Sequence, residues 1–258
     1  MVRMWSLTGV FVFFFQVTGF AQSLEKDILT KEVRYKVGQE EFVGLLAYDK
    51  ALKSPVPGVL VVHEWLGIND YAKKRAVDLA KEGYVAFAVD MYGGGKEFPV
   101  TEARTVSGKV GAVFPLIKAR FNGALEELKK EGLVDSKKIA AIGYCFGGGI
   151  VLNMARMGTD LAGVVSFHGS VNTGLTARKG DILTKILAFQ GDGDPAAPLP
   201  RRESLNKEMA EAGASFEYII YPGVAAHNFT NSAGSTYYPK EAELAWQSML
   251  GFFRKIFS

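Results

Sequence analysis

The sequence has 258 residues, of which 48% are hydrophobic and 22% are charged, and its formal net charge is +3. These values are typical of a globular protein, and the length suits one large α/β domain. The absence of a long basic run gives no electrostatic support for nucleic-acid binding, and the single cysteine excludes an internal disulfide.

The first 21 residues have the pattern of a secretory signal peptide. Arg3 is a short basic region, Val10–Phe15 is the centre of an apolar region, and the small residues Gly19 and Ala21 precede a cleavage site. The apolar run is short for a membrane span of ~20 residues, which favours cleavage over a retained anchor. We therefore expect an exported protein, periplasmic or secreted, with no stable membrane insertion after cleavage and with one domain over residues 22–258.

The pattern that follows the signal peptide predicts an N-terminal hairpin. Residues 22–32 are expected to be a polar lead-in to it. The segments Glu32–Val37 and Glu40–Asp49 read as strands on either side of Gly38-Gln39, which is turn chemistry typical of a hairpin.

Beyond the hairpin, apolar strands alternate with helices. The strands expected are Gly58–Glu64, Tyr84–Asp90, Lys138–Tyr144, Leu161–Gly169, Lys185–Gly191 and Phe216–Gly223. The first helix is expected from Asn69 or Asp70 to about Glu82. The second has no clear start and ends within Ala124–Gly132. The others are expected over Gly148–Met157, Arg201–Gly213 and Pro239–Phe257. This alternation predicts a mostly parallel sheet covered by helices on both faces, with its site at the carboxyl ends of the strands.

The segment GYCFG, Gly143–Gly147, follows one of these strands and precedes a helix. It is the frame of a nucleophile elbow, with Cys145 in the place of the commoner serine. The elbow puts this thiol at a helix N-terminus, where the helix dipole favours a thiolate. A small buried cysteine beside a glycine-rich packing contact is the alternative, and the strand–elbow–helix context favours the nucleophile.

A cysteine nucleophile needs a base, and chain order selects one of the three histidines. In α/β-hydrolases the order is nucleophile, acid, histidine, with the histidine after the last strand, and His227 fits that place. His168 is interpreted as a structural residue near the site, and His63 as a candidate lining residue of the oxyanion loop. The acid is expected in the segment GDGDP, where Asp192 and Asp194 are both candidates and one of them forms the turn.

The oxyanion hole of such a site is built from backbone N–H groups. We expect these donors to be the amides of Phe146, the residue after the nucleophile, and Trp65, in the loop after the first parallel strand. Glu64 lies beside this place, either as a surface residue or in contact with Cys145. In the second case its negative charge would oppose thiolate formation and protect the cysteine from oxidation until substrate binds.

Five motifs in order resemble the dienelactone hydrolase family of α/β-hydrolases, from about Val33 to Phe257. They are HEWLGIND (His63–Asp70), AVDMYGG (Ala88–Gly94), GYCFGG (Gly143–Gly148), GDGDPAAP (Gly191–Pro198) and AAHNF (Ala225–Phe229).

The resemblance implies an α/β-hydrolase fold without a large cap and a triad of Cys145, Asp194 and His227. It also implies that Glu64 interacts with the resting thiol, and it implies no metal and no organic cofactor.

The sequence departs from the family pattern where the family's dienelactone-opening enzymes hold the substrate carboxylate with two arginines. Those places read Gly93-Gly94 and Thr230-Asn231, and Arg104 or Lys96 are the candidate substitutes.

We expect a hydrolase of small carboxylic esters or lactones that works through an acyl-thioester, with a monomer favoured. The alternative is a non-catalytic hydrolase-fold protein that binds a small acyl compound in the cell envelope. A thiol redox role is weaker, because no resolving cysteine is present.

Overall fold

The computed structural model describes residues 26–171 and 174–258, so the expected signal peptide lies outside the described residues. The strands are β1 (Ile28–Val37), β2 (Glu40–Asp49), β3 (Val56–Val62), β4 (Val85–Val89), β5 (Val134–Tyr144), β6 (Gly163–Phe167), β7 (Lys185–Gly191) and β8 (Phe216–Tyr221). The helices are α1 (Asp70–Lys81), α2 (Val100–Gly111), α3 (Phe114–Lys130), α4 (Phe146–Arg156), α5 (Leu199–Ala212) and α6 (Pro239–Ile256).

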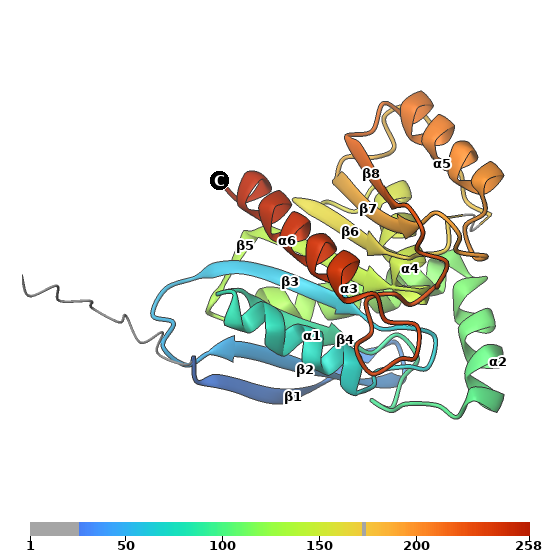
Figure 1. Ribbon diagram of the computed structural model, residues 1–258. Helices are drawn as coiled ribbons and strands as arrows, with labels where there is room; N and C mark the ends of the chain where they lie inside the picture. The colour runs from blue at the N-terminus through green and yellow to red at the C-terminus, as the bar shows by residue number, and fades with distance from the viewer. Residues whose placement is uncertain (1–25, 172–173) are drawn as a thin grey trace, which may run out of the picture.

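Within this part of the chain the strands form one eight-stranded sheet in the order β1-β2-β4-β3-β5-β6-β7-β8 (Figure 1). The pairs β1–β2 and β2–β4 are antiparallel, and the other neighbouring pairs are parallel. The predicted fold class, a mostly parallel sheet with an N-terminal antiparallel hairpin, is confirmed.

Helices cover both faces of the sheet because its central strands are apolar on both sides. In β3, Leu60 and Val62 pack in one core with α3, α4 and α5. Val59 and Val61 point the other way and pack in a second core with α1 and α6. Such two-sided burial is why β3 reads as a continuous apolar run.

Two sequence predictions need correction. The lead-in to the hairpin is shorter than expected, because β1 begins at Ile28, which pairs with Asp49 at the far end of β2. The single helix expected before Gly132 is two helices, α2 and α3. Pro115 lies in the first turn of α3 and has no N–H to donate to a preceding turn, so one helix cannot run through it.

The remaining boundaries agree to within a few residues, and their capping residues behave as the sequence suggests. The side chain of Asn69 accepts a hydrogen bond from the amide of Ala72 and caps α1. Gly83, just after this helix, has φ of 97°, which favours glycine.

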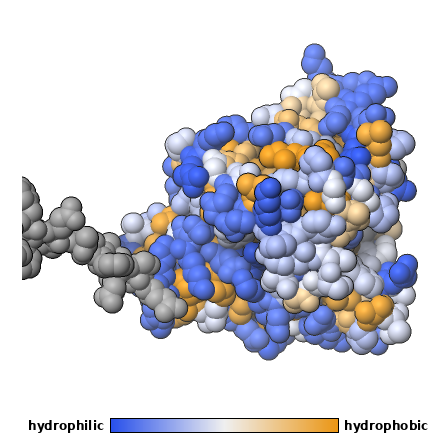
Figure 2. Space-filling model, viewed as in Figure 1, coloured by the Kyte–Doolittle hydropathy of each residue, from blue (hydrophilic) through white to orange (hydrophobic). Residues whose placement is uncertain are grey.

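The surface over α1 and α6 is mostly polar, with small apolar groups scattered among charged side chains (Figure 2). Within residues 26–171 and 174–258, no helix combines the length and the apolar character needed to cross a bilayer.

Candidate active site

Cys145 lies between β5 and α4 in a backbone conformation that few residues other than glycine adopt, with φ of 53° and ψ of −112°. The flanking glycines make this turn possible. A Cβ atom on Gly143 would lie 2.1 Å from the carbonyl oxygen of Gly147, and one on Gly147 would lie 2.3 Å from the carbonyl oxygen of Val62. The glycine frame is therefore a steric requirement of the turn that presents the thiol.

The thiol of Cys145 is part of a chain of hydrogen bonds that runs through three loops. His227 Nε2 lies 3.0 Å from Cys145 Sγ, and His227 Nδ1 lies 2.8 Å from Asp194 Oδ2. The structure thus brings together the cysteine, histidine and aspartate singled out in the sequence. The other candidate acid, Asp192, is exposed.

Asp194 is only 1% exposed, and its carboxylate is held on both oxygens. Oδ1 accepts a hydrogen bond of 2.8 Å from the amide of Ala196. Oδ2 accepts one from the side-chain amide of Gln190, in addition to the contact with His227. A carboxylate fixed in this way has one orientation from which to hold an imidazole.

The electrostatics of the site favour a charged imidazole. Burial opposes the charge on His227, but the hydrogen bonds to Asp194 and Cys145 outweigh burial and raise its pKa to about 10. The proton that this histidine carries can therefore pair with a thiolate on one side and a carboxylate on the other.

The loop after β3 lies directly against the elbow. The amide of Gly147 donates to the carbonyl of His63 at 3.1 Å, which joins the start of α4 to the end of β3. Within the described residues, the amides of Trp65 and Phe146, the two expected oxyanion donors, have no protein acceptor. Tyr92 bounds this region, since its hydroxyl donates to the carbonyl of Trp65 at 3.0 Å and its ring packs 5.4 Å from that of Phe146.

Glu64 is buried, being 6% exposed, and accepts a 3.3 Å hydrogen bond from Asn231 Nδ2. Burial raises the pKa of this carboxyl, and the bond from Asn231 and the charge of His227 partly offset that rise. Within the described residues no hydrogen bond joins Glu64 to Cys145, and the thiol is paired with His227 instead. Sequence reasoning gave Asn231 no role, because 167 positions separate it from Glu64.

The two other histidines are fully buried and hold backbone segments together. His63 Nδ1 lies 2.6 Å from the carbonyl oxygen of Glu64, and its Nε2 accepts from the amide of Met91 at 3.1 Å. Burial lowers the pKa of His63 to about 4, so it is neutral at physiological pH. His168 follows β6, at the carboxyl end of a parallel strand, which is the edge of the sheet where the site was predicted. Its Nδ1 contacts the amide nitrogen of Cys145 in the elbow.

The two candidate carboxylate-binding cations lie outside this hydrogen-bonded group. The ammonium of Lys96 rests over the ring of Phe98, 4.8 Å from its centroid. Arg104 is exposed on α2.

A pocket of 390 Å³ adjoins the site. It is lined by Leu66, Asn69, Asp70, Tyr71, Lys74, Glu97 and residues 231–234. Asn231 lines this pocket and also donates to Glu64, so the pocket lies beside the Glu64 carboxyl.

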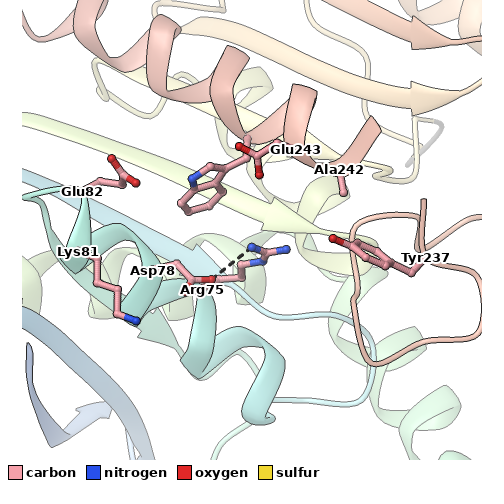
Figure 3. A pocket seen from close by; sticks show the side chains of 8 residues that line it. Arg75, Asp78, Lys81, Glu82, Tyr237, Ala242 and Glu243 are labelled. Carbon is pink, nitrogen blue, oxygen red and sulfur yellow. Dashed lines mark hydrogen bonds and ion pairs between the residues drawn. The ribbon is translucent and has the colours of Figure 1, made fainter. Parts of the chain in front are cut away.

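A second pocket, of 230 Å³, lies between α1 and α6 (Figure 3). Arg75 extends into it beside Asp78, with Nη1 and Oδ2 3.3 Å apart, and also donates to the carbonyl of Thr230 at 2.9 Å. None of the three residues of the hydrogen-bonded chain lines this pocket. Among the described residues, no three His, Cys, Asp or Glu side chains are grouped in a way that could hold a metal ion.

The site and the sheet together define a class of protein. A nucleophile elbow after a central strand, with an acid and then a histidine after later strands, is the arrangement of an α/β-hydrolase. The profile of the dienelactone hydrolase family matches residues 42–257, so the chain belongs to that family and is a hydrolase of the lactone and ester type.

Individual relatives agree with this assignment. A Yersinia pestis protein provisionally named a carboxymethylenebutenolidase is 26% identical over 230 residues, which cover 83% of this chain and 84% of that protein. A Bradyrhizobium protein provisionally named a 2-oxo-3-(5-oxofuran-2-ylidene)propanoate lactonase is 26% identical over 77% of this chain and 84% of its own length. The solved structure of a dienelactone hydrolase-like promiscuous phosphotriesterase from metagenomic libraries superposes with a TM-score of 0.83. It is 27% identical and covers 90% of this chain and 99% of its own.

Proposed function

We propose that the protein hydrolyses small carboxylic esters or lactones with Cys145 as the nucleophile, His227 as the proton carrier and Asp194 as the acid that orients it. The observation that carries this proposal is the continuous chain from the thiol to the buried carboxylate, with contacts of 3.0 Å and 2.8 Å. These separations lie within the range expected of a nucleophile, its base and the group that orients the base.

In the first half of the reaction, Cys145 Sγ attacks the carbonyl carbon and the carbonyl oxygen becomes an oxyanion. The free amides of Trp65 and Phe146 are the donors available to stabilise that charge. His227 then gives its Nε2 proton to the leaving alkoxide as the carbon–oxygen bond breaks. The product of this half is an acyl-thioester on Cys145, and in a lactone the released alcohol stays attached to the acyl group.

In the second half, water attacks the thioester. His227 accepts a proton from that water at Nε2, and the acyl group leaves as a carboxylic acid while the thiolate returns. Asp194 keeps Nδ1 protonated throughout, so that Nε2 always faces the reacting atoms. Glu64, which follows β3 beside the elbow, is proposed to discourage the free thiolate when no substrate is bound, because a second negative charge close to the thiol disfavours thiolate formation.

The decisive experiment compares the protein with its Cys145→Ala variant on p-nitrophenyl acetate and on a simple butenolide. Removing the nucleophile should lower kcat at least about 10³-fold on both substrates, because only substrate binding and the oxyanion donors remain. Acid-quenched wild-type protein should carry one acetyl group on Cys145 by mass spectrometry. Full activity of the variant would end the proposal. A wild-type protein that turns over neither probe would favour the non-catalytic binding role.

We also propose that the protein is exported to the periplasm or beyond, on the support of the apolar segment Val10–Phe15 and the small residues Gly19 and Ala21. Expression of the full sequence in a bacterial host should give a periplasmic protein that begins at Gln22, which N-terminal sequencing would detect. Phe13→Asp, which interrupts the apolar segment, should keep the uncleaved chain in the cytoplasm. A cytoplasmic location of both proteins would contradict export, and an intact N-terminus on a membrane-bound protein would indicate a retained anchor.

A further inference from the structure

His168 joins the two loops that carry the nucleophile and its base. It follows β6, is fully buried and has φ of 41°. Its Nδ1 lies 3.2 Å from the amide nitrogen of Cys145, and its Nε2 lies 2.9 Å from the hydroxyl of Thr230. Thr230 is three positions after His227, on the same loop.

These contacts determine where the proton of His168 lies. The amide of Cys145 can only donate, and it shares its hydrogen between the carbonyl of Phe167, at 3.0 Å, and Nδ1 of His168, at 3.2 Å. Nδ1 therefore accepts and carries no hydrogen. The neutral ring then holds its hydrogen on Nε2 and donates it to Thr230 Oγ1. A second proton, on Nδ1, would turn the contact with the amide of Cys145 from attraction to repulsion.

The surroundings keep the ring neutral. The titratable rings beside it are those of His227 and Tyr144, at 5.3 Å and 6.0 Å between centroids, and Arg75 adds a positive charge nearby. Burial, followed by the charges of His227 and Arg75, holds the pKa of His168 well below its usual range. His168 therefore stays neutral while His227 carries a charge.

Thr230 is itself fixed from two further sides. Its hydroxyl lies 2.8 Å from that of Tyr71, and its carbonyl accepts from Arg75 at 2.9 Å. The loop after β8 is thus anchored to α1. His168 connects Thr230 of this loop to the backbone of the elbow, in addition to the direct contact between His227 and the thiol of Cys145.

We propose that His168 is a positioning residue, which holds the Cys145 amide and Thr230 at a set separation and thereby keeps the Cys145 thiol within reach of His227. This inference rests on the proposed function, in which Cys145 and His227 act together. The sulfur–nitrogen contact of 3.0 Å depends on the relative placement of two loops, and the side chain of His168 is hydrogen-bonded to both of them. Displacement of a catalytic group by about 1 Å commonly costs about 100-fold in rate.

The test uses Thr230→Val, which keeps the shape of the side chain but removes the acceptor for His168. Two variants are matched controls: Thr230→Ser keeps the hydroxyl, and Tyr71→Phe removes the other hydrogen bond of Thr230 while leaving the bond to His168. Thr230→Val and Tyr71→Phe each disrupt buried hydrogen bonding around the same hydroxyl, so a loss of stability alone would affect both.

Two readouts separate positioning from stability. The first is the split between kcat and KM on p-nitrophenyl acetate, and the second is the rate at which iodoacetamide alkylates Cys145 at pH 7. Thr230→Val should lower kcat about 10- to 100-fold with little change in KM, and it should slow alkylation, because the imidazolium no longer stabilises the thiolate as well. His168→Asn, which tolerates the positive φ and can still accept from Cys145 but is too short to reach Thr230, should behave in the same way.

The proposal is supported if Thr230→Val and His168→Asn lose rate in both readouts while Thr230→Ser and Tyr71→Phe stay near wild type. Equal losses in Thr230→Val and Tyr71→Phe, or no loss in any variant, would overturn it. The alkylation rate needs no ester substrate. A protein that hydrolyses nothing but shows the alkylation pattern would therefore refute the proposed function and leave the role of His168 standing.

Discussion

Asp194 and His227 form the residue pair on which the charge of the site depends. The carboxylate is nearly inaccessible to water, and it accepts hydrogen bonds from Ala196 and Gln190 as well as facing His227. A buried acceptor with such partners strongly favours a protonated imidazole. This pair therefore contributes to folding as well as to the proposed chemistry.

We expect Asp194→Asn to destabilise the protein in a pH-dependent way. The pKa of His227 rises from about 6.5 in the unfolded chain to about 10 in the fold, so the folded state binds the proton more tightly. The stabilisation is complete below about pH 6.5 and is lost as pH rises towards 10. Asp194→Asn should therefore lower the free energy of unfolding by about 2 kcal/mol relative to the wild-type protein near pH 6.5, and by less at higher pH. Urea titrations of both proteins at several pH values measure this difference.

Asp192→Asn is the matched control, because Asp192 lies in the same turn and is exposed. Its effect should stay within about 0.5 kcal/mol at every pH. A stability difference for Asp194→Asn that does not change between pH 6.5 and 10 would contradict the assigned charge of His227.

Among the elements, the β5–elbow–α4 unit is the one whose geometry the sequence specifies most tightly. Two glycines and one residue with a positive φ bring the end of a buried strand against the start of a helix. The contact at Gly143 is with backbone atoms of Gly147 and Gly148, which cannot move without disturbing the start of the helix.

Gly143→Ala should therefore destabilise the protein by about 3 kcal/mol, at the upper end for an overpacked site. Gly108→Ala is the control, since a Cβ atom at this exposed position of α2 meets nothing within 4 Å. There the loss of chain entropy in the unfolded state should give a gain of about 0.5–1 kcal/mol. Chemical denaturation of both variants measures the contrast. Equal stability of the two would show that the elbow has room for a side chain.

At the scale of the whole molecule, α3, α4 and α5 pack on one face of the sheet, and a buried ion pair joins α4 to α5 in addition to the apolar packing (Figure 1). Arg156 of α4 and Glu208 of α5 lie 2.8 Å apart, with side chains 1% and 12% exposed. Glu208 also accepts from the amide of Ala177, and Arg156 donates to the carbonyl of Val171. The pair therefore connects both helices to the chain between β6 and β7.

Glu208→Ala should lower the free energy of unfolding by about 3–5 kcal/mol, because it leaves the guanidinium buried without its carboxylate. Glu211→Ala, on the same helix, removes only an exposed contact of 3.8 Å with Lys207 and should cost no more than about 1 kcal/mol. Thermal melts of the two variants give the comparison. A similar small shift for both would mean that apolar packing alone holds α5 in place.

Features that depend on neighbouring residues could be predicted from the amino-acid sequence. Alternating apolar runs and amphipathic helices specify the order of strands and helices, because burial follows the period of each element. The elbow is equally local, since the steric demands of Gly143 and Gly147 concern adjacent turns. Chain order and family resemblance then singled out Asp194 and His227.

Contacts between side chains that are distant in the sequence become visible only in the folded protein. The bond from Glu64 to Asn231 spans 167 positions, and that from His168 to Thr230 spans 62. Neither follows from a period or a motif, because each depends on how loops from different strand ends pack at one edge of the sheet. For the acid, the turn residues left Asp192 and Asp194 both open and the family resemblance implied Asp194, for which the structure gives the geometric reason. A single turn supplies both carboxyls, and the path of the loop after β8 brings His227 to the buried one.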